Sequence, residues 1–228
     1  MRNAQRMVVL AVFVILGTGG LMSRAAERES PYGQGPVKLV STEWLQEHLK
    51  GPDLLIVDAQ ADVYDYFAQH IPGAVYFCDQ TLRAPEQGMP VRYLAPEAME
   101  LLLRRVGLDN NKSVVVYTGK GQLTGTGDGL AQTMVAYTLV RFGQNNIFVL
   151  DGGLDKWTAE KRPVAKEFPK LKEGTFKVFL LDCFVSMDDL KKLKDQDNVI
   201  LIDARSVKAY EGQGPWTKPG HIPGAISL

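Results

Sequence analysis

The pentapeptide His-Ile-Pro-Gly-Ala occurs twice in this chain, at residues 70–74 and again at residues 221–225. Each copy follows a serine-capped helical pattern and a short apolar run that ends in Asp-Ala, at Asp58 in the first copy and at Asp203 in the second. A repeated string in the same local context indicates an internal duplication, which constrains the architecture more than any other feature. The sequence therefore predicts two copies of one folding unit, with the pentapeptides 151 residues apart.

The residues between the two copies alternate between strand-like and helix-like patterns. Short apolar runs predict buried strands over residues 54–57, 74–77, 113–117 and 147–150. The spacing of apolar residues predicts helices that start after Ser41 and at Pro96, that run over 130–142 and that contain Trp157. Strands that alternate with helices favour an α/β fold, in which a parallel sheet is covered by helices on both faces.

The first 25 residues have the layout of a secretory signal. Residues 1–6 carry two arginines and no acid, residues 7–22 are uncharged and mostly apolar, and Ser23 and Ala25 are small residues before a cleavage point. We expect an exported, periplasmic protein that meets a membrane only through this segment if it stays uncleaved. A membrane anchor is the alternative, although the apolar run is short against the roughly 20 residues that span a bilayer. Residues 26–37 are polar and rich in glycine and proline, which predicts a linker.

Charge and cysteine content exclude other classes. Lysine plus arginine number 26, aspartate plus glutamate number 26, and there is no basic run, so the sequence predicts no nucleic-acid partner. The two cysteines, Cys78 and Cys183, match no zinc-binding spacing, and we expect neither a metal site nor a cofactor. Both are expected to be inert thiols, and their spacing leaves open whether they form a disulfide.

The motifs of the first copy resemble the rhodanese domain. They are the unit of helix, strand and aspartate that ends at Asp58, the string Tyr66-x-x-x-His70-Ile-Pro-Gly-Ala, the strand over residues 114–117, and the string VLDGG followed by Trp157. The two copies together are similar to the two-domain thiosulfate and mercaptopyruvate sulfurtransferases. The resemblance implies a rhodanese-like parallel sheet in a complete domain over residues 38–165, a linker over 166–180 and an incomplete second domain over 181–228.

The resemblance also implies an activity. Rhodanese-type enzymes move a sulfane sulfur from a donor, through a cysteine persulfide, to a thiophilic acceptor. The implied partners are a small sulfur-containing anion such as thiosulfate and a thiol or cyanide-like acceptor. A non-catalytic rhodanese module that binds a partner or a sulfur compound in the periplasm is the alternative. A phosphatase on the same fold is a weaker one, because it also needs a loop cysteine and an arginine that the first copy lacks.

The family places its reactive cysteine directly after the central strand, and the first copy has Thr118 at that position. A threonine hydroxyl is not an anion near neutral pH and cannot form a persulfide, so we expect the first copy to be catalytically silent. In the second copy, Leu228 corresponds to Phe77, which lies well before that position. We therefore predict no catalytic residue within these 228 residues and a nucleophile in a C-terminal part beyond them. A natural truncation is the alternative.

Six residues are expected to be structural: Asp58, His70, Gly73, Asp203, His221 and Gly224. The histidines and glycines belong to a predicted type II turn, with proline and then glycine at its two central positions. The aspartates are expected to end buried strands and to orient the neighbouring loops.

Arg205 and Lys208 are the candidate substrate-binding residues. Arg205 completes the Asp-x-Arg of the resembled family, where the first copy has Gln60 instead. A further arginine that the family's two-domain members use to hold the donor corresponds here to Ala209, beside Lys208. Selectivity for thiosulfate or mercaptopyruvate therefore does not follow from the resemblance. The glycine-rich loop over 119–129 lacks the spacing of a nucleotide site and is expected to be an elongated, silent loop.

Overall fold

The computed structural model describes residues 37–125, 127, 129–182, 184–215 and 218–228. Contacts divide them into two compact units, residues 37–182 and residues 184–228, which we call the first lobe and the second lobe. The predicted signal segment over 1–25 lies outside the described residues, and so does the predicted linker except for Val37. Among the described residues no helix is long and apolar enough to cross a membrane.

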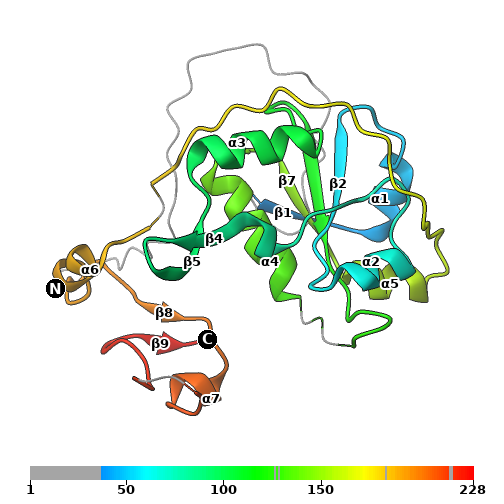
Figure 1. Cartoon of the computed structure of the whole chain (residues 1–228). Coiled ribbons are helices and arrows are strands. Elements are labelled where there is room, and N and C mark those ends of the chain that lie inside the picture. Colours follow the sequence, from blue (N-terminus) through cyan, green and yellow to red (C-terminus); the bar gives the residue numbers. More distant parts are fainter. Residues whose placement is uncertain (1–36, 126, 128, 183, 216–217) are drawn as a thin grey trace, which may run out of the picture. The chain divides into compact units, whose positions relative to one another are not determined.

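A five-stranded, fully parallel sheet forms the centre of the first lobe (Figure 1). Its order is β1 (Val37–Val40), β7 (Ile147–Leu150), β6 (Ser113–Tyr117), β2 (Leu54–Asp58) and β3 (Val75–Tyr76). Side chains on both faces of the middle strand β6 are fully buried, from Val114 to Tyr117, as an unbroken apolar run predicts. The α/β fold class with a parallel sheet is confirmed.

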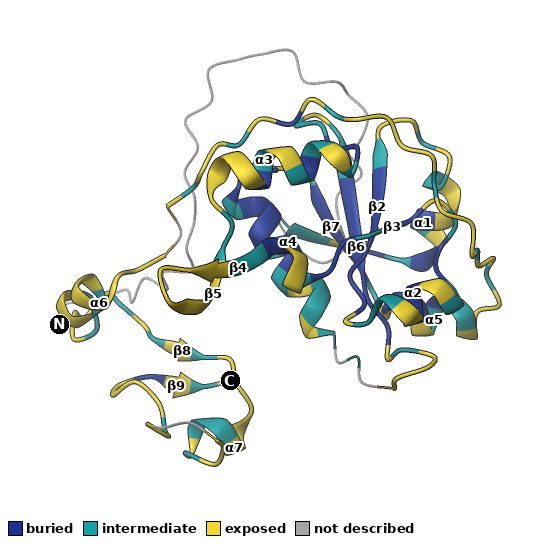
Figure 2. Ribbon diagram, viewed as in Figure 1, coloured by how far each residue is buried: buried dark blue, intermediate teal, exposed yellow. Residues whose placement is uncertain are grey.

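Helices cover both faces of this sheet. They are α1 (Thr42–His48), α2 (Val63–Ala68), α3 (Pro96–Arg105), α4 (Leu130–Arg141) and α5 (Gly153–Ala159). One core cluster joins Val114 and Val116 of β6 to Leu139 of α4, and a second joins Val115 to Trp157 of α5. Figure 2 shows the resulting pattern, with buried strands between helices that are exposed on their outer sides.

Three features of the first lobe were not predicted. Strand β1 begins at Val37 inside the predicted linker and pairs with β7 at the edge of the sheet. A 3-10 helix, η1 (Asp79–Leu82), leads into an antiparallel hairpin of β4 (Arg83–Glu86) and β5 (Met89–Tyr93). Helix α2 has only six residues, and Asp62 caps it by accepting a 2.8 Å hydrogen bond from the Tyr64 N–H.

Residues 166–182, which we call the strap, contain no helix or strand but belong to the first lobe. Phe176 is fully buried, and its N–H donates a 3.1 Å hydrogen bond to the Leu108 carbonyl. The Leu181 N–H donates one of 2.8 Å to the Arg141 carbonyl. The predicted linker over 166–180 is thus tied to the first lobe by hydrogen bonds and by the buried Phe176 side chain, while most of its residues are exposed.

The second lobe contains α6 (Met187–Leu193), β8 (Ile202–Asp203), α7 (Val207–Tyr210) and β9 (Ile226–Ser227), and β8 pairs in parallel with β9. The prediction of a buried strand that ends at Asp203 is wrong for this structure, because Ile202 is 51% exposed. Ala225 is the only apolar residue in the described part of this lobe that is buried. Among the described residues of the second lobe, β8 and β9 are therefore covered by almost no buried apolar side chain.

Candidate functional site

The chain reverses its direction of travel across the sheet between β2 and β6. From β2 it continues outward to β3, and from β6 it continues to β7 on the opposite side. In open α/β sheets, ligands bind outside the carboxyl ends of the strands at such a reversal. The residues that follow these two ends are Gln60, two positions after Asp58, and Thr118, directly after Tyr117.

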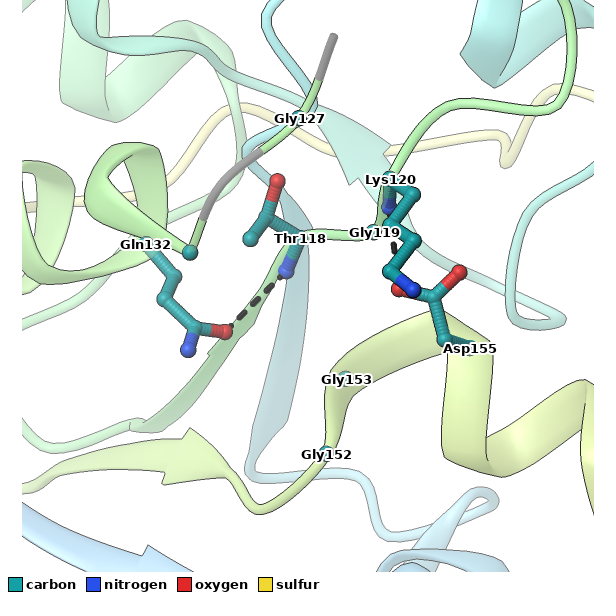
Figure 3. Close-up of a pocket in the computed structure, with 9 residues that line it drawn as sticks. Thr118, Gly119, Lys120, Gly127, Gln132, Gly152, Gly153 and Asp155 are labelled. Atoms are coloured by element: carbon teal, nitrogen blue, oxygen red, sulfur yellow. Dashed lines mark hydrogen bonds between the residues drawn. The ribbon is translucent and has the colours of Figure 1, made fainter. Parts of the chain in front are cut away.

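Thr118 lies between the end of β6 and the loop that leads to α4, where the sequence predicts it. Its N–H donates a 3.2 Å hydrogen bond to Oε1 of Gln132 in α4, and its carbonyl accepts one of 2.8 Å from the Leu154 N–H of α5 (Figure 3). The residue is 4% exposed, and its Oγ1 has no hydrogen-bond partner among the described residues. Hydrogen bonds from α4 and α5 therefore fix the Thr118 backbone, while its hydroxyl makes no hydrogen bond to a described residue.

A cavity of about 280 Å³ lies at this end of the sheet (Figure 3). Its lining combines a hydroxyl, an ammonium, an amide and a carboxylate with five glycines, and it consists of Thr118, Gly119, Lys120, Gly127, Gly129, Gln132, Gly152, Gly153 and Asp155. The carboxylate and the loop are connected, because the Lys120 N–H donates a 2.9 Å hydrogen bond to Asp155 Oδ2.

The glycine-rich loop before α4 is held by Asp65, which sequence reasoning missed. Asp65 is 2% exposed, and its carboxylate accepts hydrogen bonds of 2.6 Å from the Leu123 N–H and 2.6 Å from the Thr124 hydroxyl. Burial alone would raise the pKa of Asp65, but these hydrogen bonds outweigh it and lower that pKa. No local pattern reveals this role, because the partners lie 58 and 59 residues away.

Asp58 is the centre of a buried polar network. Its Oδ2 accepts hydrogen bonds of 2.7 Å from the Tyr117 hydroxyl and 3.0 Å from Gln60 Nε2, and its Oδ1 accepts one of 2.9 Å from the Gln60 N–H. Burial raises the pKa of Asp58 to about 6, although these donors favour the charged form. The same burial, with the nearby carboxylate, raises the pKa of Tyr117 well above its usual value.

His70 and Gly73 hold the turn before β3 through backbone contacts. The fully buried His70 ring stacks on Tyr66 with centroids 4.0 Å apart, and Nδ1 lies 2.8 Å from the Tyr66 carbonyl oxygen. Its Nε2 lies 3.2 Å from the carbonyl oxygen of Glu167 in the strap. Gly73 occupies the third position of the turn at a φ of +81°, and the Ala74 N–H closes it. Every hydrogen-bond partner that the structure gives the His70 ring is a backbone carbonyl.

The second lobe contains the same contacts. The Tyr66 hydroxyl donates a 2.8 Å hydrogen bond to the Ala74 carbonyl, and the Tyr210 hydroxyl donates one of 2.8 Å to Ala225. The His221 ring stacks on Tyr210 at 3.7 Å, and Nδ1 lies 2.9 Å from the Tyr210 carbonyl oxygen. Gly224 has a φ of +88°, as the turn requires.

Asp203 is paired with Arg205, where Asp58 is paired with Gln60. Arg205 donates from Nη2 to Asp203 Oδ2 at 2.6 Å and from its N–H to Oδ1 at 3.0 Å. These bonds lower the pKa of Asp203 to about 2. Arg205 Nη2 also donates to the Gly220 carbonyl at 2.8 Å, so the guanidinium connects Asp203 to the residue before His221. Lys208 is exposed on α7.

Cys78 is a free, buried thiol that follows β3 and does not lie in the loop between β6 and α4. Cys183 lies outside the described residues, so the disulfide question stays open. Among the described residues, no group of three or more His, Cys, Asp and Glu side chains could hold a metal ion.

The sequence matches a known domain family. The profile of the rhodanese-like domain matches residues 41–160 and residues 186–228, which is more than half of the chain. The chain belongs to the rhodanese family. The crystal structure of SseA from Escherichia coli, a 3-mercaptopyruvate sulfur-transferring enzyme of rhodanese fold, superimposes with a TM-score of 0.69 at 26% identity. That match covers 83% of this chain and 73% of SseA.

Curated relatives of this rhodanese-family chain are named sulfurtransferases. A protein of Synechococcus elongatus, provisionally named a thiosulfate sulfurtransferase, is 32% identical over 223 residues, which are 97% of this chain and 66% of that protein. The 3-mercaptopyruvate sulfurtransferase of Escherichia coli K12 is 27% identical over 83% of this chain and 70% of its own length. The thiosulfate sulfurtransferase of Corynebacterium glutamicum is 29% identical over 85% of this chain and 65% of its own length. The chain thus spans about two thirds of these relatives.

Proposed function

We propose that the protein is a two-domain rhodanese-type sulfurtransferase whose nucleophile is a cysteine in a second domain that continues past Leu228. The thiolate attacks the outer sulfur of a thiosulfate-like donor, the S–S bond breaks, and sulfite leaves with the electron pair. A thiol or cyanide-like acceptor then attacks the outer persulfide sulfur and releases the thiolate. The names of the relatives support the reaction class, and they leave the donor open.

The observation that carries this proposal is the presence of threonine at the family's cysteine position in the first lobe. The second lobe supports it, because its hydrogen bonds follow those of the first as far as its last residue. The Phe77 N–H donates to the Asp58 carbonyl at 2.9 Å, and the Leu228 N–H donates to the Asp203 carbonyl at 3.2 Å. Counted in the same way, the equivalent of Thr118 comes after Leu228.

In this account the first lobe is a domain that does not itself carry out the sulfur transfer. The protein is exported to the periplasm by its N-terminal segment, which the residue pattern over 1–25 supports. Cell fractionation of a tagged protein tests the export separately from the chemistry. Recovery of the tagged protein in the periplasmic fraction supports export, and recovery in the cytoplasm contradicts it.

The chemistry is tested by cyanide-dependent formation of thiocyanate from thiosulfate and from 3-mercaptopyruvate, using the product of the whole gene. We expect turnover with at least one donor, and loss of turnover when the cysteine after the second copy's central strand is replaced by serine. A continuation that lacks such a cysteine, or a whole-gene product with no turnover, would favour the non-catalytic binding module instead.

A further inference from the structure

His70 is a fully buried histidine whose two ring nitrogens both face carbonyl oxygens. Nδ1 lies 2.8 Å from the oxygen of Tyr66, and Nε2 lies 3.2 Å from the oxygen of Glu167 at the start of the strap. A carbonyl oxygen only accepts hydrogen bonds, whereas a neutral imidazole donates from one nitrogen and presents a lone pair at the other. A neutral His70 therefore satisfies one of these two carbonyls, and an imidazolium satisfies both.

The residues beside this ring fasten the same part of the chain. The His70 N–H donates a 3.0 Å hydrogen bond to the Ala165 carbonyl, and the Ala165 N–H donates one of 2.8 Å to the His70 carbonyl. Phe168 stacks on Tyr66 with ring centroids 6.0 Å apart, and Tyr66 in turn stacks on the His70 ring. The beginning of the strap thus lies against His70 through its backbone and through a row of aromatic rings.

The titratable groups near His70 come from β2, the strap, α2 and β6. Burial raises the pKa of Asp58 at the end of β2, and a positive charge on His70 opposes that rise. Backbone hydrogen bonds lower the pKa of Glu167 in the strap, and a positive charge on His70 lowers it further. Burial raises the pKa of the Tyr66 and Tyr117 phenols, so both stay neutral near neutral pH. The two carboxylates therefore favour a proton on the His70 ring.

The second copy of the pentapeptide has the same ring geometry without the strap contact. The His221 ring stacks on Tyr210, and its Nδ1 faces the Tyr210 carbonyl oxygen at 2.9 Å. Among the described residues, no hydrogen bond is formed by its Nε2, and the side chain is exposed. The contact between Nε2 and a carbonyl is therefore particular to the first copy, and His221 provides a matched control.

We propose that His70 is a proton-dependent clasp, in which a proton on Nε2 fastens Glu167 to the turn before β3 and loss of that proton frees residues 166–168. Deprotonation leaves a lone pair on Nε2 that faces the Glu167 carbonyl oxygen, so repulsion replaces a hydrogen bond. The proton passes to solvent, and no covalent bond of the chain changes. The later part of the strap stays in place, because the hydrogen bond from the Phe176 N–H to the Leu108 carbonyl does not involve His70.

The test follows the ring nitrogens of the three histidines and the exchange of backbone amides in the full chain by NMR, from about pH 5 to about pH 9. We expect the Nε2 proton of His70 to be lost over the same pH interval in which the Ala165 N–H loses protection. That protection, relative to an unstructured chain at the same pH, should fall roughly tenfold as the pH rises. The Phe176 N–H should keep its protection. A His70 ring that keeps one protonation state over the whole range, or that titrates while the protection of Ala165 is unchanged, would overturn the proposal.

Three variants make the test specific. His70→Phe keeps an aromatic ring against Tyr66 but removes both nitrogens, so the protection of the Ala165 N–H should be low at every pH. His221→Phe, the matched change in the second copy, should keep the pH dependence of wild type. Glu167→Gln keeps the backbone carbonyl and should keep that dependence as well. If His70→Phe does not fold, the titration of the wild-type chain decides alone. The wild-type pH dependence in a folded His70→Phe variant, or its loss in Glu167→Gln, would assign the effect to a nearby carboxyl and contradict the clasp.

Discussion

The Tyr117 hydroxyl connects the carboxyl ends of the two central strands by donating a 2.7 Å hydrogen bond to Asp58 Oδ2. The same hydroxyl accepts a 3.0 Å hydrogen bond from the Ile71 N–H, at the start of the turn that contains Gly73. The side chains of Tyr117 and Asp58 are both fully buried. One phenol therefore fixes the end of β2, the end of β6 and the turn before β3 at the position from which Thr118 leaves the sheet.

Asp58 should make the stability of the protein depend on pH. Because burial raises its pKa from 3.8 to about 6, the folded state keeps a proton that the unfolded state loses between these values. The free energy of unfolding should then fall by roughly 3 kcal/mol in all as the pH rises from about 3 to about 7, most steeply between about 4 and about 6. Asp58→Asn should remove this slope in urea denaturation measured across that range. Asp53→Asn, an exposed site next to the same strand, should keep it. Equal slopes in the two variants would contradict this assignment.

Replacing Tyr117 by phenylalanine should have two effects. The free energy of unfolding should fall by about 1–3 kcal/mol, because the buried Asp58 oxygen loses a donor and the Ile71 N–H loses its acceptor. The pKa of Asp58 should also rise, which moves the loss of stability to higher pH. Tyr64→Phe, at a tyrosine that is 64% exposed, is the control for urea denaturation at several pH values. A Tyr117→Phe variant with the stability of wild type would refute this prediction.

Gly143 should be required for the strap to lie on the first lobe. Its φ is +96°, and an added Cβ would lie 2.8 Å from the Phe179 carbonyl oxygen and 3.0 Å from the Phe179 nitrogen. Gly88 has a φ of +80° with no atom within 4 Å of such a Cβ, so Gly88→Ala measures the backbone strain alone, about 1–2 kcal/mol. Gly143→Ala should be clearly more destabilising and should speed proteolysis within residues 166–182. The same loss of stability and the same digestion in both variants would contradict a packed strap.

Asp65 should protect the glycine-rich loop from proteases. In Asp65→Asn, the negative charge is lost and one acceptor oxygen becomes an amide nitrogen, so the charge-assisted hydrogen bonds from the Leu123 N–H and the Thr124 hydroxyl are weakened. We expect trypsin to cleave after Lys120 several times faster than in wild type, as measured by peptide mass spectrometry. Asp53→Asn is again the control. Unchanged cleavage in Asp65→Asn would show that other contacts hold the loop.

The sequence predicts the first lobe well where signals are local. Ser41 caps α1 as its type and position indicate, and the apolar runs at 113–117 and 147–150 are strands. The position of Thr118 directly after β6 also follows from sequence order. Local signals are sufficient here because buried parallel strands need unbroken apolar runs.

Features that depend on distant residues could not be predicted. Asp65 contacts Leu123 and Thr124 only after the fold brings α2 to the loop. The strap belongs to no helix or strand, and its place in the core depends on Phe176 reaching Leu108. The exposure of Ile202 depends on which residues lie beside β8, which a run of apolar letters does not show.

The most direct test of the central claim is the intact mass of the 228-residue chain after incubation with thiosulfate. The account predicts no added sulfur atom on Cys78 or Cys183 and no thiocyanate on addition of cyanide, because the first lobe has Thr118 where a persulfide would form. A persulfide on either cysteine that is released as thiocyanate would place the chemistry within these residues and contradict the account.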